Sequence, residues 1–414
     1  MSESTVELFE HLVAIPSPSG RERRVATFIR EWLGDRGVQA DFDGAGAHNG
    51  SDCGNLIATI RGNPTHPRLL FVAHMDTVES GEVRIVPEIS PDGIIRSQGN
   101  TILGADNKSA VAALMRLCAW AASAVFEDRP TIVAAFTCRE ESGRMGASLL
   151  DLEANRVDCG FCVDGNNAIG TAVIRTFGQR TFTLTITGRA AHAAASPEEG
   201  VNAIEVASRI IAALTLGRQA RGGTLNIASI VGGELVHRLN GQPVPGDEPD
   251  PDRARGLIAA TATNSVPDVV HVRGEVRAFS DEDIREILEQ VGETVADVCD
   301  SFGAEHDWSN ELARGIPPFP GSAESRSRAL AREAAAMVPS VQFEEIVGPY
   351  TLEVNYLAPR CDVVALSSGG RNPHQASETI TIEELHSLEA YLKAIVKTAV
   401  ASADLVPSPA PPSR

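Results

Sequence analysis

Four apolar, strand-like runs in this chain end at polar side chains that could bind a metal ion. The most informative run, residues 69–73, leads directly into His74 and Asp76. Five consecutive apolar residues are typical of a strand buried on both faces of a parallel sheet. An imidazole and a carboxylate at its end are typical of a metal ligand and the acid that orients it. The other three runs, residues 131–138, 161–163 and 362–366, are followed by Glu140 and Glu141, by Asp164, and by His374. Ligands of open α/β sheets bind beyond the carboxyl ends of the strands, so we expect these side chains at one sheet edge.

The candidate ligands are two imidazoles and three carboxylates: His74, His374, Asp106, Glu141 and Asp164. Nitrogen and oxygen donors without a thiolate favour a catalytic zinc, cobalt or manganese ion. A structural zinc, by contrast, usually binds cysteine. Five protein ligands are too many for one open catalytic zinc, so we predict two divalent metal ions, most readily zinc, that share a carboxylate. Two ions about 3.5–4 Å apart can polarise a carbonyl and hold a hydroxide.

Asp106 is the predicted bridging ligand. It follows Gly104, which permits a tight turn, and precedes an Ala/Leu-rich helix at 109–122, of which it could instead be only the N-cap. The adjacent Glu140 and Glu141 would repel each other unless a cation neutralises one of them. We therefore predict that Glu141 binds metal and that Glu140 acts as general base. The alternative is a pair of solvated glutamates in a loop.

Alternating strands and helices over residues 1–176 predict an α/β/α sandwich with a mixed, mostly parallel sheet. The pattern changes near Phe177, and residues 181–187 alternate as in a half-exposed antiparallel strand. We predict an inserted α+β domain at 177–315, with two helices on a four-stranded antiparallel sheet, and a return to the first domain at 316–403. Residues 404–414 are a Pro/Ser-rich tail that we expect to be disordered.

Composition limits the possible partners and location. A length of 414 residues favours two domains, and the net charge of −19 argues against a nucleic-acid partner. No apolar run approaches the roughly 20 residues that span a membrane, and residues 1–10 do not resemble a signal peptide. The seven scattered cysteines indicate reduced thiols in a cytoplasmic protein. Cys159 and Cys162 have redox-like spacing, but we interpret them as buried core residues.

The ordered motifs resemble those of the di-zinc metallopeptidase family of peptidase T, carboxypeptidase G and aminoacylase-1. They are His-x-Asp at 74–76, Gly-x-Asp-x-Lys at 104–108, Glu-Glu at 140–141, Val-Asp-Gly at 163–165, Gly-x-x-x-His at 188–192 and the histidine at 374. The resemblance extends from residues 15–17 to the last helix. Residues 71–78, 104–108 and 372–374 are most similar to the peptidase T branch.

The resemblance implies how the ligands divide between the two ions: His74 and Asp164 on one, Glu141 and His374 on the other, and Asp106 bridging. It also implies that Asp76 orients His74, that Glu140 is the base, and that the Asp106–Asn107 peptide is cis.

The inserted domain would be the lid and dimerisation domain of the family, which implies a homodimer. His192, which by itself could be merely structural, would stabilise the oxyanion, reaching in from the partner subunit. Asn264 and Arg277 match positions that bind a substrate carboxylate, a task that suits the planar guanidinium. Arg277 could instead be an ordinary exposed strand residue.

Two departures from the family pattern concern the substrate. The loop 241–255 is longer than in relatives, and Gly-Pro-Tyr-Thr at 348–351 replaces their Gly-Gly-Ser/Thr-Asp. The sequence therefore leaves the shape of the pocket and the exopeptidase polarity open.

These features predict an aminopeptidase-like exopeptidase that hydrolyses small peptides bearing a free carboxylate, with water activated between two metals and Glu140 as base. An alternative is a deacylase of N-acyl amino acids or secondary metabolites. A metal-dependent binding protein would need neither Glu140 nor His192. A nucleotide-binding oxidoreductase is disfavoured because the glycines at 44 and 46 lack the third glycine of the fingerprint.

Overall fold

The computed structural model describes residues 3–78, 83–123, 128–220, 222–233, 236, 263–310, 315–322 and 324–401. The loop 241–255 and the tail 404–414, for which the sequence made specific predictions, lie outside these residues. The chain divides into two compact units. The first unit comprises Met1–Thr176, Phe319–Gly348 and Leu352–Arg414, and the second comprises Phe177–Pro318 and Pro349–Thr351.

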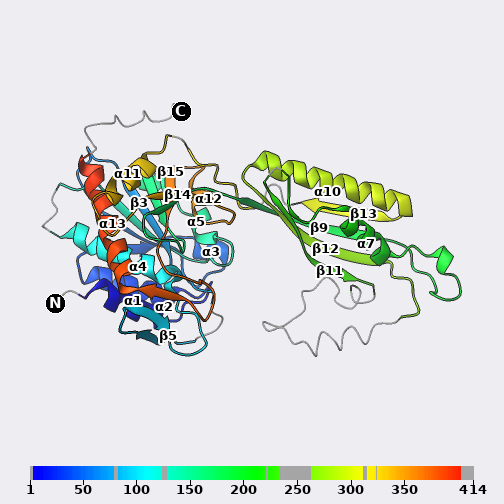
Figure 1. Ribbon diagram of the computed structural model, residues 1–414, viewed down its shortest axis with the longest axis horizontal. Helices are drawn as coiled ribbons and strands as arrows, with labels where there is room; N and C mark the ends of the chain where they lie inside the picture. Colours follow the sequence, from blue (N-terminus) through cyan, green and yellow to red (C-terminus); the bar gives the residue numbers. More distant parts are fainter. Residues whose placement is uncertain are drawn as a thin grey trace. The chain divides into compact units, whose positions relative to one another are not determined.

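The first unit is built on an eight-stranded mixed sheet (Figure 1). The strands lie in the order β1 (Ala40–Phe42), β2 (Leu56–Ile60), β6 (Ile132–Thr137), β3 (Leu69–His74), β7 (Cys159–Val163), β15 (Asp362–Leu366), β8 (Thr171–Thr176) and β14 (Glu344–Gly348). Neighbours among β6, β3, β7 and β15 are parallel, so their carboxyl ends meet at one edge. Every residue of β3 and β6 is buried, which explains why both strands read as continuous apolar runs.

Helices cover both faces of this sheet (Figure 1). On one face, the mostly buried α4 (Ala105–Ala122) packs on β3 beneath α1 (Thr5–Val13), α2 (Arg23–Gly34) and α13 (Ile382–Ala401), with α11 (Arg326–Ala335) beside α13. Short helices lie on the other face: α3 (Gly46–Asn49), α5 (Met145–Ser148) and α12 (Val354–Leu357). The predicted α/β/α sandwich is confirmed.

A small three-stranded sheet that was not predicted lies beside the large one. Its strands, β4 (Pro87–Ile89), β5 (Ile94–Ser97) and β16 (Thr379–Thr381), pair in antiparallel fashion. Strands of three or four residues are too short to show a period, so sequence reasoning assigned none of them. The sheet joins the segment before residue 103 to the segment after His374.

The second unit is an antiparallel sheet with two helices, as predicted. Its strands lie in the order β10 (Gly217–Arg218), β11 (Thr224–Gly232), β12 (Val269–Ala278), β9 (Gly178–Thr187) and β13 (Glu305–Asn310). The prediction had four strands, whereas this sheet has five, of which β10 has only two residues. Buried and less buried residues alternate along β9. The helices are α7 (Ala203–Ala213) and α10 (Asp281–Phe302), and the Ser280 hydroxyl caps α10 by accepting from the Asp283 N–H at 3.0 Å, as expected.

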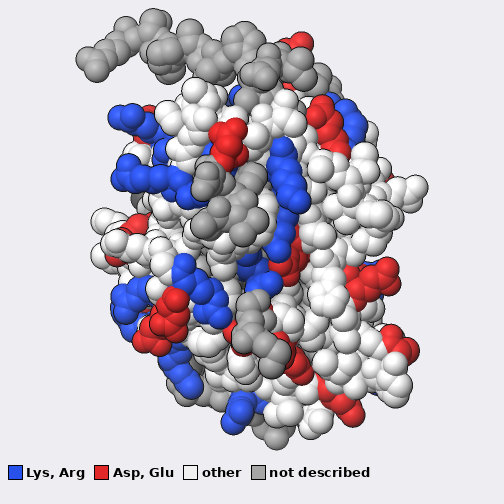
Figure 2. Space-filling model, turned by 90° about the vertical axis from the view of Figure 1, so that its left-hand side faces the viewer, with Lys and Arg blue, Asp and Glu red and all other residues white. Residues whose placement is uncertain are grey.

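Surface and core features agree with an ordinary globular protein. On the face shown in Figure 2, basic and acidic side chains are interspersed. No helix in the described ranges is long and apolar enough to cross a bilayer. Cys159 and Cys162 are buried free thiols in β7, which confirms their interpretation as core residues.

Candidate metal centre

The five candidate ligands come together at the carboxyl edge of the sheet in the first unit. His74 ends β3, Glu141, Asp164 and His374 lie beyond β6, β7 and β15, and Asp106 lies at the start of α4. His74 Nε2 lies 3.2 Å from Asp106 Oδ1 and 3.9 Å from Asp164 Oδ1. His374 Nε2 lies 3.5 Å from Asp106 Oδ2 and 3.0 Å from Glu141 Oε1. Asp106 therefore presents one carboxylate oxygen to each histidine.

The backbone around Asp106 is shaped for this contact. Asp106 and Asn107 have non-helical dihedral angles, and the peptide bond between them is cis, as the family resemblance implied. Gly104 has a φ of +76°, a conformation that favours glycine. Regular helical geometry therefore begins after Asn107. The Asp106 carboxylate faces His74 and His374, which is the placement expected of a shared ligand rather than of a helix cap alone.

Asp76 connects His74 to the two glutamates. His74 Nδ1 lies 3.5 Å from Asp76 Oδ1 and 3.1 Å from the Asp76 carbonyl oxygen. These acceptors favour the proton on Nδ1 and leave Nε2 free to bind a cation. The buried Asp76 carboxylate also accepts hydrogen bonds from Glu140 N at 3.0 Å and Glu141 N at 3.1 Å. It thus fixes both the imidazole and the backbone of the two glutamates.

The electrostatics of the cluster suit a cation. Burial raises the pKa of Asp164 to about 7, and the charges of Asp106 and Glu141 add to this effect. Burial also opposes ionisation of Asp106, but hydrogen bonds from His374 and His74 outweigh it and lower its pKa. The same contacts with Asp106 and Glu141 raise the pKa of His374 to about 10. A divalent cation would relieve the repulsion between these carboxylates, so the donor set fits a metal.

Glu140 is not a solvated loop residue. It is 3% exposed, and its Oε1 lies 2.9 Å from Arg144 Nε. Burial raises the pKa of Glu140, although His74 and Arg144 oppose this shift. A buried carboxyl group with a raised pKa beside the ligand cluster is suited to accept a proton.

His192 and Asn264 lie side by side in the second unit. The exposed His192 accepts hydrogen bonds at Nδ1 from Ala194 N at 3.2 Å and Ala195 N at 3.1 Å, which leaves the ring proton on Nε2. His192 forms a β-bridge with Ser265, and the Asn264 carbonyl accepts from the Ala193 N–H at 3.0 Å. The imidazole is therefore oriented to donate from Nε2.

Arg277 is paired within its own strand. Its Nε lies 2.9 Å from Glu275 Oε1, and an Nη2 donor lies 3.2 Å from Oε2. Gln179 donates to the same Glu275 carboxylate at 2.7 Å. A substrate carboxylate that bound Arg277 would have to share it with Glu275.

Sequence reasoning did not recognise four buried charged residues around the centre: Glu22, Lys108, Glu353 and Glu378. Lys108 belongs to the Gly-x-Asp-x-Lys motif, and its Nζ donates to Ser17 Oγ at 2.6 Å. Glu353 follows the segment Gly-Pro-Tyr-Thr at 348–351, where the sequence departs from the family pattern. Only the motif around Lys108 offered a signal, because the other three residues act through contacts distant in sequence.

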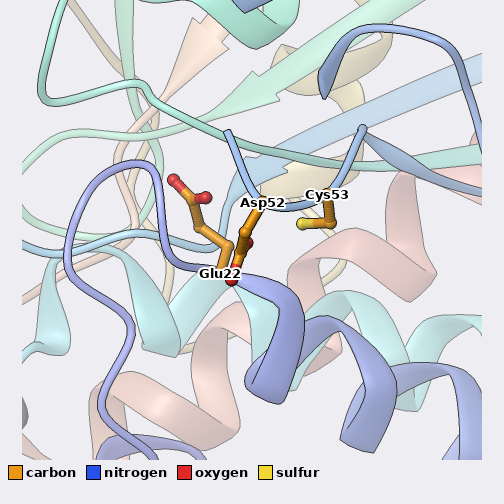
Figure 3. Close-up of side chains that lie close together, drawn as sticks. All are labelled: Glu22, Asp52 and Cys53. Carbon is orange, nitrogen blue, oxygen red and sulfur yellow. The ribbon is translucent and has the colours of Figure 1, made fainter. Parts of the chain in front are cut away.

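Glu22, Asp52 and Cys53 form a second group whose potential ligand atoms lie within 4.8 Å of one another (Figure 3). The Glu22 carboxylate, however, already accepts three hydrogen bonds, from Gly20 N at 2.7 Å, Arg139 N at 2.9 Å and Ser51 Oγ at 2.6 Å. Burial raises the pKa of the Cys53 thiol, so this sulfur stays protonated. We interpret the group as support for the backbone before Glu140 rather than as a metal site.

Glu353 gives a prediction for the pH dependence of stability. Burial raises its pKa from 4.5 to about 7, although His74 and Thr137 lower it. The folded state therefore favours the protonated form of Glu353. This preference contributes fully to the free energy of unfolding below pH 4.5, and the contribution is lost as the pH rises through 7. The Glu353→Gln variant is neutral at every pH. Between pH 5 and pH 8 its free energy of unfolding should therefore rise by roughly 2–3 kcal/mol relative to that of wild type. Urea denaturation of EDTA-treated protein measures this gain, and an equal difference at both pH values would attribute the effect to packing.

Two comparisons with protein families define the class of this protein. Residues 55–203 match peptidase family M28, and residues 174–302 match the peptidase dimerisation domain. Together with the cluster of imidazole and carboxylate ligands, these matches place the protein among the metal-dependent peptide hydrolases.

Individual relatives are similar to this chain over nearly its whole length. Aminopeptidase PepT from Bacillus cereus ATCC 10987 has a TM-score of 0.82 and 28% identity, covering 96% of this chain and 98% of that one. A tripeptidase from Staphylococcus aureus subsp. aureus Mu50 has a TM-score of 0.83 and 26% identity, with the same coverage of 96% and 98%. The protein YqjE of Bacillus subtilis strain 168 is 27% identical over 395 residues, 95% of this chain and 98% of that protein. The chain is thus similar to peptidase T-like metallopeptidases over nearly its whole length, which confirms the resemblance seen in its motifs.

Proposed function

We propose that this protein is a dinuclear metal-dependent exopeptidase of small peptides, aminopeptidase-like in its polarity. The observation that carries the proposal is the placement of Asp106, with one carboxylate oxygen 3.2 Å from His74 Nε2 and the other 3.5 Å from His374 Nε2. Relatives described as an aminopeptidase and a tripeptidase support a peptide substrate.

Each proposed ion has its own imidazole and carboxylate. His74 and Asp164 would hold one ion, His374 and Glu141 the other, and Asp106 would bridge them. Zinc suits this nitrogen and oxygen donor set best, and cobalt or manganese would also fit. When bound, such ions supply a water of lowered pKa and polarise the scissile carbonyl.

The side chains of the protein would carry the proton transfers. Glu140 accepts the proton of the attacking water and passes it to the leaving amine. Arg144 holds the Glu140 carboxylate, and Asp76 keeps His74 in the tautomer that binds metal. His192 of the second unit would donate its Nε2 proton to the oxyanion, a contribution of roughly 3–4 kcal/mol for one donor.

The second unit would serve as lid and dimerisation domain, with Asn264 and Arg277 binding the substrate carboxylate. The match to the peptidase dimerisation domain supports a homodimer. In the described ranges, β10 pairs with β11 only at Thr224 and Leu225. Farther along β11, Ile230 is 47% exposed, which is consistent with a subunit contact on this strand. The free cysteine thiols are consistent with the cytoplasmic location that we propose.

Metal analysis combined with a substrate panel tests the proposal. We expect about two zinc, cobalt or manganese ions per chain, by mass spectrometry of protein purified without chelator, because the five ligands suit a dinuclear site. Tripeptides or dipeptides with a free amino group should be cleaved, and their N-acetylated counterparts should not. Cleavage of N-acyl amino acids instead would replace the proposal by the deacylase alternative. A protein that binds no metal, even after soaking, would contradict both.

A further inference from the structure

The loop that carries His374 also carries a buried carboxylate, Glu378, which is 2% exposed. Its Oε2 accepts hydrogen bonds from Leu103 N at 2.8 Å and Gly104 N at 2.7 Å, and its Oε1 accepts from Asp106 N at 2.9 Å. Three short bonds from N–H groups to one carboxylate are charge-assisted and therefore strong. They hold the backbone that presents the proposed bridging ligand.

His374 and Glu378 belong to one short, closed loop. Arg371 N donates to Thr379 O at 2.8 Å, and Thr379 N donates to Arg371 O at 3.1 Å, which joins the two ends of the loop. Directly after Glu378, β16 pairs with β5, with Thr379 opposite Arg96. The chain continues from β5 towards Leu103, so this pairing brings Glu378 to the segment that it binds.

The His374 side chain has little packing of its own to fix it. It is 48% exposed, and its backbone has a φ of +62°. Its Nε2 must nevertheless lie near Asp106 Oδ2, now at 3.5 Å, for the two residues to share an ion. Glu378 is the residue of the same loop that is attached to the Asp106 backbone.

We propose that Glu378 is a positioning residue for the metal pair: by binding the backbone from Leu103 to Asp106, it sets the spacing between His374 and Asp106. The inference rests on the proposed function because it takes both residues as metal ligands. Glu378 itself would bind neither metal nor substrate. Mutation of supporting residues of this kind typically weakens metal binding or activity about 10–100-fold.

Glutamine at position 378 tests this contact selectively. The amide has one acceptor oxygen, whereas the carboxylate serves donors on both oxygens. If the amide oxygen faces Leu103 and Gly104, the NH2 group opposes the Asp106 N–H. The flipped amide would lose the two other bonds. Either orientation loosens the Asp106 loop, and the side-chain volume stays the same.

Asp362 is a matched control in the same unit. It lies at the start of β15, and its Oδ2 also accepts from two backbone N–H groups, Arg326 at 2.6 Å and Ser327 at 3.1 Å. Asp362→Asn therefore removes a carboxylate that binds backbone amides at the opposite edge of the sheet from the ligands.

The experiment titrates cobalt(II) into metal-free wild type, Glu378→Gln and Asp362→Asn, with the visible spectrum and a competing chromophoric chelator as readouts. Glu378→Gln should bind at least one ion about 10–100-fold more weakly and show an altered cobalt spectrum. Asp362→Asn should bind as wild type does, even if its melting temperature falls. Glu378→Asp, which keeps the charge but not the reach, is measured by the same criterion should the glutamine variant fail to fold.

The outcomes separate the inference from the proposed function. Wild-type affinity and spectrum in the Glu378 variant would overturn the positioning role, whatever happens to its stability. Equal losses in the Glu378 and Asp362 variants would also overturn it, because general destabilisation would then account for both. A wild-type protein that binds no cobalt would overturn the proposed function, and the inference with it.

Discussion

Replacing Glu140 by glutamine is expected to lower kcat by about 10²–10⁴-fold, the usual contribution of a general base, and to leave the metal content unchanged. The amide cannot accept the proton of water, and all five proposed metal ligands are untouched. Glu140 is buried, and its Oε1 lies 2.9 Å from Arg144 Nε, so its side chain is confined. Glutamine preserves the volume of this side chain. KM should change little, because no substrate contact is removed.

Steady-state kinetics on the best peptide of the panel and metal analysis of the same preparation check this result. The control is Glu141→Gln, whose Oε1 lies 3.0 Å from His374 Nε2 and which should lose metal. If Glu140→Gln loses metal and Glu141→Gln keeps it, the two glutamates have exchanged roles. If both variants keep full activity, the general-base assignment is wrong.

The central strands β3 and β6 of the first unit were predictable because they are buried along their whole length. The run that ends at His74 is continuous and apolar, and all six residues of β3 are indeed buried. The sequence alternation in β9 predicted a half-exposed strand, and every second residue of β9 is indeed buried. β13, a polar edge strand, and the short β4, β5 and β16 have no such periodicity, so only long-range pairing defines them.

The candidate site was predictable as a set of ligand types, but its supporting contacts were not. Residues with suitable ligand atoms follow several strands, which is enough to expect these residues at one edge of the sheet. The structure brings the five candidate ligands together there. The hydrogen bonds of Glu378 span more than 270 positions, and those of Asp76 to the glutamates span more than 60. No local pattern encodes such distances. The roles of His192, Asn264 and Arg277 in the second unit remain predictions.

Replacing Asp106 by alanine is expected to remove both metal ions and to reduce peptide hydrolysis to background, whereas His374→Ala should remove only one ion. The reason is the geometry of the shared carboxylate, with Oδ1 3.2 Å from His74 Nε2 and Oδ2 3.5 Å from His374 Nε2. Loss of a bridging ligand weakens both positions, and loss of a terminal imidazole leaves the second position with its own ligands. Metal content by mass spectrometry after dialysis, measured beside kcat, gives both quantities.

Asp52→Ala is the matched control for this experiment. Asp52 is an exposed aspartate of the Glu22, Asp52 and Cys53 group, so its removal should change neither metal content nor activity if that group is structural, as the saturated Glu22 carboxylate indicates. Loss of one ion from the Asp52 variant would instead show that the group binds metal. A stoichiometry of one in both the Asp106 and His374 variants would contradict the bridge, because a carboxylate that serves a single ion cannot take both ions with it. The number of ions lost with Asp106 thus decides between a dinuclear centre and two independent sites.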